Sequence, residues 1–437
     1  MPTLPDGDRL RRVLVIARDF PPASGAPAIR IAKLAKYLGE FGWIPTVVTA
    51  PIDHAWDLDT SLEDDLTSGL AVWRTPRLLS TTVAPKVRQS DGGRAIAGSS
   101  LPRRLVAKLC YPDPSLLWAV PAARKAAKLG RNQDAIITSG PPFSTHLVGL
   151  WVSRRLGLPW VADYRDNWSG NPATGTHPVR HRLDRLVDSQ VLKTADAVTV
   201  VSRAAATELQ DQLGVQPTRL FIAMNGFDVD DLPASPDRSK DFLICYAGSL
   251  DERRDIRPLL TALQRAGRRS PDLARDLRLS LIGRIPDWAA GAALRELGSD
   301  RVTIGCLRPH REALAEASAA AVLLVLSSAA EAGGATMTSK LLECLGLRRP
   351  VLMLAPSGPG VDLVTELGAG ETAIPDDVPA IEESVLRLYG DWRSGHERVA
   401  DQASLIPLTR RVTGEVFAAA LDAAVRSKRG LGSNYGE

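Results

Sequence analysis

Residues 13–49 indicate the fold of the chain: VLVIARDFPPASGAPAIRIAKLAKYLGEFGWIPTVVT. This segment begins with a β-rich run, Val13–Ala17, and passes through a loop of proline, serine and glycine. A helix is predicted next, from apolar residues spaced at i, i+3, i+4 and i+7: Ile31, Leu34, Ala35 and Leu38. Its basic residues fall on the other faces: Arg30, Lys33 and Lys36. A second strand is predicted over Ile44–Thr49, which completes a strand-helix-strand unit of the kind that builds parallel sheets.

The same alternation of strand and helix continues along the first half of the chain. Four more strands are predicted there: Asp134–Thr138, Trp160–Asp163, Ala197–Val201 and Leu220–Ala223. Three helices are predicted between them: Ser144–Leu156, Val179–Lys193 and Arg203–Leu213. Ser202 directly precedes the last of these helices and is expected to cap its N-terminus.

A polar stretch with two prolines, Leu232–Asp241, has the composition of a linker, and the pattern restarts after it. Strands are predicted over Phe242–Tyr246, Arg278–Gly283, Val302–Ile304, Ala321–Leu326 and Val351–Leu354, and helices over Ile256–Ala266 and Val412–Lys428. We therefore expect an α/β protein with two doubly wound domains, residues 1–235 and 236–411, and a C-terminal helix and tail over 412–437. Two such domains should face each other across a cleft, with ligands outside the C-terminal ends of the strands.

The composition excludes several classes of protein. The 437 residues, 44% hydrophobic and 24% charged, are typical of a soluble globular protein. A net charge of +4 is too small for a dedicated nucleic-acid binder. The four cysteines lie far apart and form neither a zinc-site spacing nor a disulfide scaffold: Cys110, Cys245, Cys306 and Cys344. The N-terminus lacks a signal-like apolar run, so we expect a cytoplasmic protein.

Residues of about 68–110 do not fit the alternation. This segment carries eight basic residues against one acid, Asp91: Arg74, Arg77, Lys86, Arg88, Arg94, Arg103, Arg104 and Lys108. One interpretation is a solvated insertion whose charges keep it soluble. The other is a patch that meets anionic lipid or a phosphorylated acceptor, which would give reversible, salt-sensitive contact with a membrane surface.

Two loops that follow predicted strands are candidates for binding an anion. In Ser24-Gly25, small residues before a helix let backbone N–H groups approach a negative charge, although an ordinary tight turn has the same composition. In the run Gly248–Arg254, a glycine at a strand end is followed by arginines that can cradle a diphosphate. The structural alternative is a surface arginine pair that balances nearby acids. No dinucleotide fingerprint and no P-loop sequence is present.

A third candidate, Gly333–Glu343, follows a buried run and opens a predicted helix with Lys340. Glycines followed by Thr338 or Ser339 as a cap make another helix N-terminus that can face an anion. Glu343 can accept hydrogen bonds from ribose hydroxyls, and a capping box is the structural alternative.

A charged group stands at the end of the strand predicted over Trp160–Asp163. In Asp163-Tyr164-Arg165-Asp166, two carboxylates flank an arginine, which can orient an acceptor hydroxyl or contact a phosphate. The alternative is an aspartate–arginine pair that holds a loop.

Seven fragments, in this order, resemble bacterial glycosyltransferases of family 4, which have the GT-B fold. They are RDFPPASGAPAIRIAKLAKYLGEFGW, SGPPFSTHL, VADYRDNW, VTVVS, MNGFD, YAGSLDERRD and SKLLECLGLRRPVL. The resemblance covers nearly the whole chain except about 52–100 and the tail. It implies a GT-B-like pair of Rossmann-like domains, an acceptor held mainly by the first, a nucleotide-sugar donor held mainly by the second, and retention at the anomeric carbon.

The resemblance also assigns residues to the donor. Gly25 matches a family glycine near the donor diphosphate, and Gly248 matches the glycine that opens the family's glycine-to-lysine motif. Arg254 matches the basic residue of that motif. An arginine usually follows the glycine of this motif, but Ser249 stands there, so Arg253 is the candidate to share its role.

Further matches concern the transferred sugar. Glu343 matches the second of the family's two paired acids, and Lys340 matches a lysine of one branch. The first acid falls at Ala335, which cannot do its work, unless an insertion brings in Glu331. Ser139 stands where many members have a histidine, while His146 is expected to be a packed or surface histidine inside a helix.

The expected activity is transfer of a sugar from a nucleotide sugar to an acceptor hydroxyl, with Ser139, Asp163 and Arg165 as the catalytic candidates. The leaving diphosphate, stabilised by cations and helix N-termini, would take the acceptor proton, so that neither a carboxylate nucleophile nor a metal is needed. No DxD-type acid pair follows a strand of the second half, although Asp230-Asp231 lies near the linker. The expected partners are the donor and a small-molecule or lipid-linked acceptor, with no nucleic acid and no protein partner.

Two alternatives stay open. A nucleotide-sugar epimerase would use no acceptor, and Asp163 and Asp166 would be its acid and base. A catalytically silent binding subunit is the other, because Ser139, Ser249 and Ala335 all depart from the family pattern.

Overall fold

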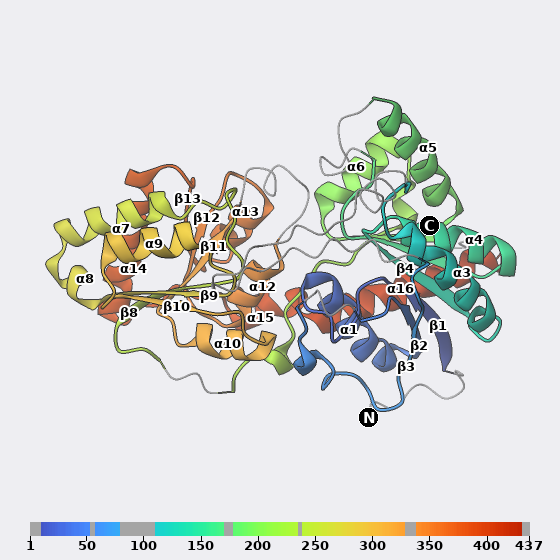
Figure 1. Cartoon of the computed structure of the whole chain (residues 1–437), viewed down its shortest axis with the longest axis horizontal. Helices are drawn as coiled ribbons and strands as arrows, with labels where there is room; N and C mark the ends of the chain where they lie inside the picture. The colour runs from blue at the N-terminus through green and yellow to red at the C-terminus, as the bar shows by residue number, and fades with distance from the viewer. Residues whose placement is uncertain are drawn as a thin grey trace, which may run out of the picture. The chain divides into compact units, whose positions relative to one another are not determined.

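The computed structural model describes residues 10–52, 57–78, 110–169, 178–234, 238–327 and 338–430. The chain forms two α/β units (Figure 1): Met1–Met224 with Thr413–Glu437, and Asn225–Val412. The first unit ends before the boundary expected at 235. The C-terminal residues, expected to stand apart, belong to the first unit, so the chain runs into the second unit and returns.

Among the described residues, the first unit is built on a seven-stranded parallel sheet in the order β3-β2-β1-β4-β5-β6-β7. The strands are β1 (Arg11–Ile16), β2 (Trp43–Thr49), β3 (Ala71–Arg74), β4 (Ala135–Gly140), β5 (Trp160–Tyr164), β6 (Ala197–Val200) and β7 (Leu220–Ile222). The central strands β4, β5 and β6 are buried throughout, as expected for a parallel sheet with helices on both faces.

The helices of this unit are α1 (Ala26–Leu38), α3 (Leu116–Gly130), α4 (Ser144–Leu156), α5 (Pro178–Thr194), α6 (Arg203–Leu213) and α16 (Arg410–Lys428). Helix α4 has the predicted bounds, and the predicted cap of α6 is confirmed because Ser202 Oγ accepts from the Ala205 N–H at 3.0 Å. Helix α16 returns the chain to the first unit, where Phe417 and Leu421 lie in the same core as Val13 and Val15.

The second unit has a six-stranded parallel sheet in its described residues, in the order β10-β9-β8-β11-β12-β13. Its strands are β8 (Phe242–Ala247), β9 (Leu277–Ile282), β10 (Val302–Gly305), β11 (Val322–Leu326), β12 (Val351–Leu354) and β13 (Gly370–Ala373). Its helices are α7 (Arg257–Arg269), α8 (Pro271–Asp276), α9 (Asp287–Leu297), α10 (His310–Ser318), α12 (Ser339–Gly346), α13 (Pro359–Glu366), α14 (Val378–Ser394) and α15 (Gln402–Leu405).

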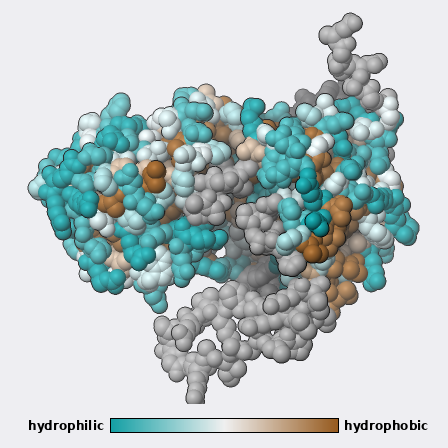
Figure 2. All heavy atoms as spheres, turned by 90° about the horizontal axis from the view of Figure 1, so that it is seen from above, coloured by the Kyte–Doolittle hydropathy of each residue, from teal (hydrophilic) through white to brown (hydrophobic). Residues whose placement is uncertain are grey.

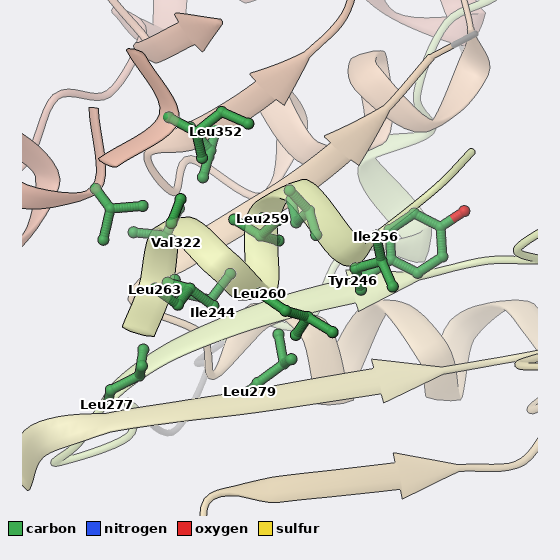
Figure 3. Close-up of a cluster of buried hydrophobic side chains, with 14 of the residues drawn as sticks. Ile244, Tyr246, Ile256, Leu259, Leu260, Leu263, Leu277, Leu279, Val322 and Leu352 are labelled. Atoms are coloured by element: carbon green, nitrogen blue, oxygen red, sulfur yellow. The ribbon is translucent and has the colours of Figure 1, made fainter. Parts of the chain in front are cut away.

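The core of the second unit forms where α7 packs on the sheet (Figure 3). The apolar side of α7 presents Leu259, Leu260 and Leu263, which meet Ile244 of β8 and Leu279 of β9. This helix is strongly two-sided: its buried positions are aliphatic, and arginines occupy the opposite side. The α/β architecture predicted from the strand and helix periods is confirmed in both units.

Helix α1 carries buried charges beside its apolar face. The sequence pattern placed Arg30 and Lys33 off the apolar face, but both side chains are buried. Arg30 pairs with Asp163 and Lys33 with Asp65, so carboxylates supplied by distant segments replace water as their partner. A helix buried on nearly all sides is possible only because these charges are matched inside the unit.

The two places where the chain changes units lie side by side. Phe227 and Thr409 form a parallel bridge, with hydrogen bonds from Phe227 N to Leu408 O and from Arg410 N to Phe227 O. Gly226 fits here because a Cβ at this position would lie 2.7 Å from the Leu408 carbonyl oxygen. Gly226 therefore permits the backbone contact between the segment that enters the second unit and the segment that leaves it.

We expect opposite effects from the same substitution at two helical glycines. In α4, Gly149→Ala would place a methyl group 2.5 Å from the Trp160 ring, so overpacking of about 1–3 kcal/mol should outweigh a helix-propensity gain of about 1 kcal/mol. In α14, Gly390→Ala meets nothing within 4 Å and should stabilise by up to about 1 kcal/mol. Hydrogen exchange measured separately for each unit tests both, and a Gly149→Ala protein as stable as the wild type would contradict this packing.

Candidate functional site

In both units the order of the strands reverses at one point, which is where open α/β sheets bind ligands. In the first unit this point lies between β1 and β4, and in the second between β8 and β11. The predicted anion-binding loops follow these strands: Ser24-Gly25 comes after β1, Gly248–Arg254 after β8, and α12 is the first described helix after β11. The topology therefore places the donor-site candidates of the second unit at its switch point.

Gly248 and Lys340, named separately from the sequence, meet in the structure. A Cβ at Gly248 would lie 2.1 Å from Lys340 Nζ, and the residue has a positive φ of 153°. Gly283, at the end of β9, approaches the same place, because its own Cβ would lie 2.2 Å from the Gly248 carbonyl oxygen. Because neither glycine has a side chain, the Lys340 ammonium group can lie against the turn after β8.

Tyr246 organises this cluster and was not recognised from the sequence, where it was only the end of a strand. Its hydroxyl donates to the Ser249 carbonyl at 2.9 Å and lies 3.5 Å from Lys340 Nζ. The ammonium group also stands 5.3 Å from the centre of the Tyr246 ring, within the range of a cation–π contact. The β8 turn and the first turn of α12 are therefore connected by one tyrosine.

Arg253 and Arg254 share one carboxylate, that of Asp251. Arg253 donates to it at 3.0 Å and is exposed, while Arg254 lies 3.3 Å from it and is mostly buried. Burial pushes the pKa of Asp251 up, but the Arg253 hydrogen bond and the Arg254 charge outweigh it, and the pKa falls below its usual value. The structural alternative, a surface arginine that balances nearby acids, therefore fits Arg253. Arg254 also lies 3.5 Å from the Ser249 carbonyl, at the turn that Tyr246 holds.

Glu343 lies on α12 beside a histidine that the sequence did not single out. His310 Nε2 is 3.7 Å from Glu343 Oε1 and 3.6 Å from Asp231 Oδ2. Arg311 donates to the other oxygen of Asp231 at 3.1 Å, so Asp231 is held by side chains of α10. Glu331 and Ala335, on which the identity of the first acid depends, lie outside the described residues.

Helix α12 begins without the capping box that was considered for it. Thr338 occupies the N-cap position, but its side chain makes no capping hydrogen bond. The N–H groups of the first turn therefore have no side-chain cap from Thr338, and they lie next to Lys340 in sequence. Both these N–H groups and the Lys340 side chain would favour a negative charge at this end of α12.

In the first unit, Ser139 and Asp163 are paired residues of neighbouring strands and lie inside the fold. Asp163 accepts from Arg30 Nε at 3.0 Å and Arg30 Nη2 at 2.7 Å, and from Ser139 Oγ at 2.7 Å. Thr199 Oγ1 adds a fourth bond at 2.8 Å. Burial alone would raise the pKa of this carboxyl, but the charge and hydrogen bonds of Arg30 and the two hydroxyl groups lower it.

These contacts bear on how Ser139, Asp163 and Arg165 can act. The Asp163 carboxylate is ionised, fully buried and bonded at both oxygens, so it is suited to hold β4 and β5 in place. Arg165 donates to the Pro141 carbonyl, and its backbone N–H bonds to Gly140 O at 2.9 Å. Burial lowers the pKa of Arg165, and the nearby Asp163 charge opposes this. Their predicted contact with substrate stays a prediction.

His146 is a packed histidine, as the sequence suggested. It is fully buried, stacks on Tyr164 with ring centres 4.6 Å apart, and meets Thr138 Oγ1 at 2.9 Å through Nδ1. Burial lowers its pKa to about 3, with a smaller opposing effect of Asp163, so the ring is neutral at pH 7. Gly140 makes room for it, because a Cβ there would lie 2.6 Å from His146 Nε2.

Gly25 occupies the N-cap position of α1 and has a backbone conformation that favours glycine. Its φ is 98°, its carbonyl accepts the Ile29 N–H at 3.1 Å, and Pro27 occupies the first turn of the helix. This is the geometry of a tight turn into a helix, with the N-terminus of α1 directly after it. Its expected proximity to a donor diphosphate stays a prediction.

The comparisons with known proteins agree with this architecture. Residues 25–226 match the family model described as "Glycosyl transferase 4-like domain". The chain is 24% identical over 316 residues to the 2-deoxystreptamine glucosyltransferase of Streptomyces kanamyceticus, covering 65% of this chain and 78% of that protein.

Solved structures give likenesses of the whole fold. Alr3699/HepE of Anabaena, in complex with UDP and glucose, matches with a TM-score of 0.65 and 16% identity over 94% of this chain and 99% of that chain. A UDP-N-acetylglucosamine 2-epimerase from Listeria monocytogenes, itself called putative, matches with a TM-score of 0.60 and 13% identity over 95% and 96%.

Two parallel Rossmann-like sheets with these likenesses define the class: the protein is a glycosyltransferase of the GT-B fold. Residues 25–226 carry the glycosyl transferase 4-like domain, so the resemblance to family 4 read from the seven fragments is confirmed.

We expect Asp163→Asn to destabilise the first unit by about 3–5 kcal/mol, because it leaves Arg30 buried without its counter-charge. The double variant Arg30→Met/Asp163→Asn should recover much of this loss, and a double-mutant cycle measures the coupling. Because folding lowers the pKa of Asp163, its contribution is complete above the usual value of 3.8 and is lost as the pH falls below it.

The same variant separates a structural role of this carboxylate from a chemical one. Hydrogen exchange of the first unit reports stability, and an assay of glycosyl transfer reports activity. An Asp163→Asn protein of wild-type stability that has lost activity would place the carboxylate in the reaction instead.

Proposed function

We propose that the protein transfers a hexosyl group from a nucleoside-diphosphate sugar to an acceptor hydroxyl, with retention of anomeric configuration. The observation that carries this proposal is the cluster of Gly248, Lys340, Tyr246 and Arg254 at the switch point of the second unit. Two cations, a turn with a glycine at its start and a helix N-terminus that Thr338 does not cap are what a diphosphate requires. The first unit would hold the acceptor.

The names of similar proteins support the class of donor and acceptor. HepE is described in complex with UDP and with UDP-glucose, and the Streptomyces kanamyceticus relative is named for glucosyl transfer to 2-deoxystreptamine. We therefore propose UDP-linked glucose as the first donor to test. A small soluble acceptor and a lipid-linked acceptor both fit the proposal.

The proposed reaction balances without a covalent intermediate. The bond between the anomeric carbon and the diphosphate oxygen breaks while the acceptor oxygen attacks from the same face. The departing diphosphate takes the acceptor proton, and Lys340 and Arg254 stabilise its growing negative charge. These cations and the α12 N-terminus supply the positive charge, so we propose that no metal ion is required.

An epimerase is the alternative, favoured by the likeness to the Listeria monocytogenes structure. An epimerase would need a carboxylate that can exchange protons with the sugar. Asp163, which was named for that role with Asp166, is buried and accepts four hydrogen bonds. A change of the donor sugar in the absence of acceptor would establish this alternative. A silent binding subunit would bind the nucleotide and neither hydrolyse nor transfer the sugar.

We expect Lys340→Ala and Arg254→Ala each to weaken UDP binding by about 1.5–3 kcal/mol, which is roughly 10- to 150-fold in Kd, because each removes a charge-assisted hydrogen bond. Arg257→Ala is the matched control, since this exposed arginine pairs with Asp255 at 2.6 Å in the same unit. Calorimetric titration measures all three. Equal affinities in the wild type and both site variants would show that the diphosphate does not bind at this cluster.

A second experiment concerns the reaction itself. With UDP-α-glucose and an acceptor alcohol, we expect an α-glycoside by NMR and undiminished turnover in EDTA, because the proposed charge stabilisation uses only protein groups. A β-glycoside would contradict retention. Activity lost in EDTA and restored by Mg²⁺ or Mn²⁺ would contradict the proposed metal independence.

A further inference from the structure

Helix α5 of the first unit turns its two acids inward, together with Val191 and Leu192, and leaves three aliphatic residues of its first half exposed. Asp188 is buried and accepts from Tyr164 OH and from Ser169 Oγ, each at 2.7 Å. Asp184 is buried and accepts from Trp168 Nε1 at 3.2 Å. The exposed side carries Val179, Leu183 and Leu186, with 67%, 42% and 68% of their surface exposed.

The three aliphatic residues form one continuous stripe. They are spaced at i, i+4 and i+7, which places them within about 60° of one another around the helix. Single exposed apolar residues are normal on protein surfaces, but a stripe opposite the buried side is not produced by core packing. Figure 2 shows apolar side chains reaching the surface of the first unit beside hydrophilic ones.

Cations border this stripe on the side that faces α6. A groove of about 520 Å³ runs here, and Arg182, Arg185 and Lys193 line it together with Leu186 and Leu213 of α6. No carboxylate lines the groove in the described part of the chain. Arg185 donates to the Gln212 carbonyl at 3.1 Å, and all three basic residues are exposed.

The charge and the shape of this surface select its occupant. A second copy would bring three cations against the same three cations. A small soluble anion would leave the outward aliphatic stripe uncovered. The described helices include none that is both long and apolar enough to cross a bilayer. An aliphatic stripe with basic residues along its edge is the pattern of a helix that lies in the headgroup layer.

We propose that the α5 surface, made of Val179, Leu183 and Leu186 with Arg182, Arg185 and Lys193, docks the first unit on an anionic membrane. The aliphatic residues enter the boundary of the acyl chains, and the basic residues meet lipid phosphates. This surface is separate from the basic segment of about 68–110, most of which lies outside the described residues. The inference does not depend on the proposed function.

Vesicle flotation with the full-length protein tests the proposal. We expect binding to phosphatidylcholine vesicles that contain 30% phosphatidylglycerol, weak binding to phosphatidylcholine alone, and loss of binding at high salt. Arg182→Glu/Arg185→Glu should weaken binding at least about 30-fold, from about 1 kcal/mol for each cation near an anionic surface. Leu183→Ser/Leu186→Ser should weaken it roughly tenfold or more, because burial of the stripe is lost.

The matched control is Arg265→Glu/Arg268→Glu, which makes the same change of net charge on exposed arginines of α7 in the second unit. We expect this variant to bind vesicles like the wild type, and thermal melting confirms that all variants are folded. Wild-type protein that does not float with anionic vesicles at low salt overturns the proposal and leaves an acidic protein surface as the occupant of α5. Equal weakening by the α7 control would also overturn it, because net charge alone would then explain the binding.

Discussion

Arg30 and Asp163 form an ion pair in the interior of the first unit, and the middle of that unit is arranged around it. The guanidinium group joins α1 to β5 through two hydrogen bonds and to the chain after β7 through the Ala223 carbonyl at 2.9 Å. It also stands 5.2 Å from the ring of Phe417, on the helix that returns from the second unit. Ser139 and Thr199 add β4 and β6 through the carboxylate. Elements from both ends of the chain thus depend on one buried pair, which is tolerable only because every charge and lone pair in it is matched.

The second unit depends on a different constraint, the absence of side chains at two turns. Gly248 and Gly283 let the ends of β8 and β9 and the start of α12 approach one another, and Lys340 fills the space that a side chain at Gly248 would take. Tyr246 then holds the turn after β8 through the Ser249 carbonyl. The cationic groups of the proposed donor site are therefore placed by backbone packing before any ligand binds, which is the preorganisation that electrostatic stabilisation of a leaving group requires.

The proposed membrane surface follows from the same first-unit packing. Tyr164 ends β5 and stacks on His146, and its hydroxyl draws Asp188 of α5 into the interior. Trp168 and Ser169 add further partners for the two acids of this helix. Once Asp184 and Asp188 are held inward, the positions on the opposite side of α5, which carry Val179, Leu183 and Leu186, face outward. The surface property is thus a consequence of where the polar network of the core lies.

The sequence by itself determined most of the alternation of strands and helices, the two-unit α/β class, the cap at Ser202 and the resemblance to family 4. These are local or additive signals: hydrophobic period, turn composition and short motifs depend on neighbours in the chain. The sequence missed β13, and it missed β3 because this strand lies in the segment of about 68–110 that did not fit the alternation. It named Gly248 and Lys340, but not that they touch, and it did not find Tyr246, Arg30 or His310. Only the tertiary structure decided those roles, because Asp163, which pairs with Arg30, and Lys340, which lies beside Tyr246, come from elements far along the chain. It also decided that Arg30 and Lys33 are buried, because burial of a charge depends on whether a distant carboxylate meets it, and no periodicity records that.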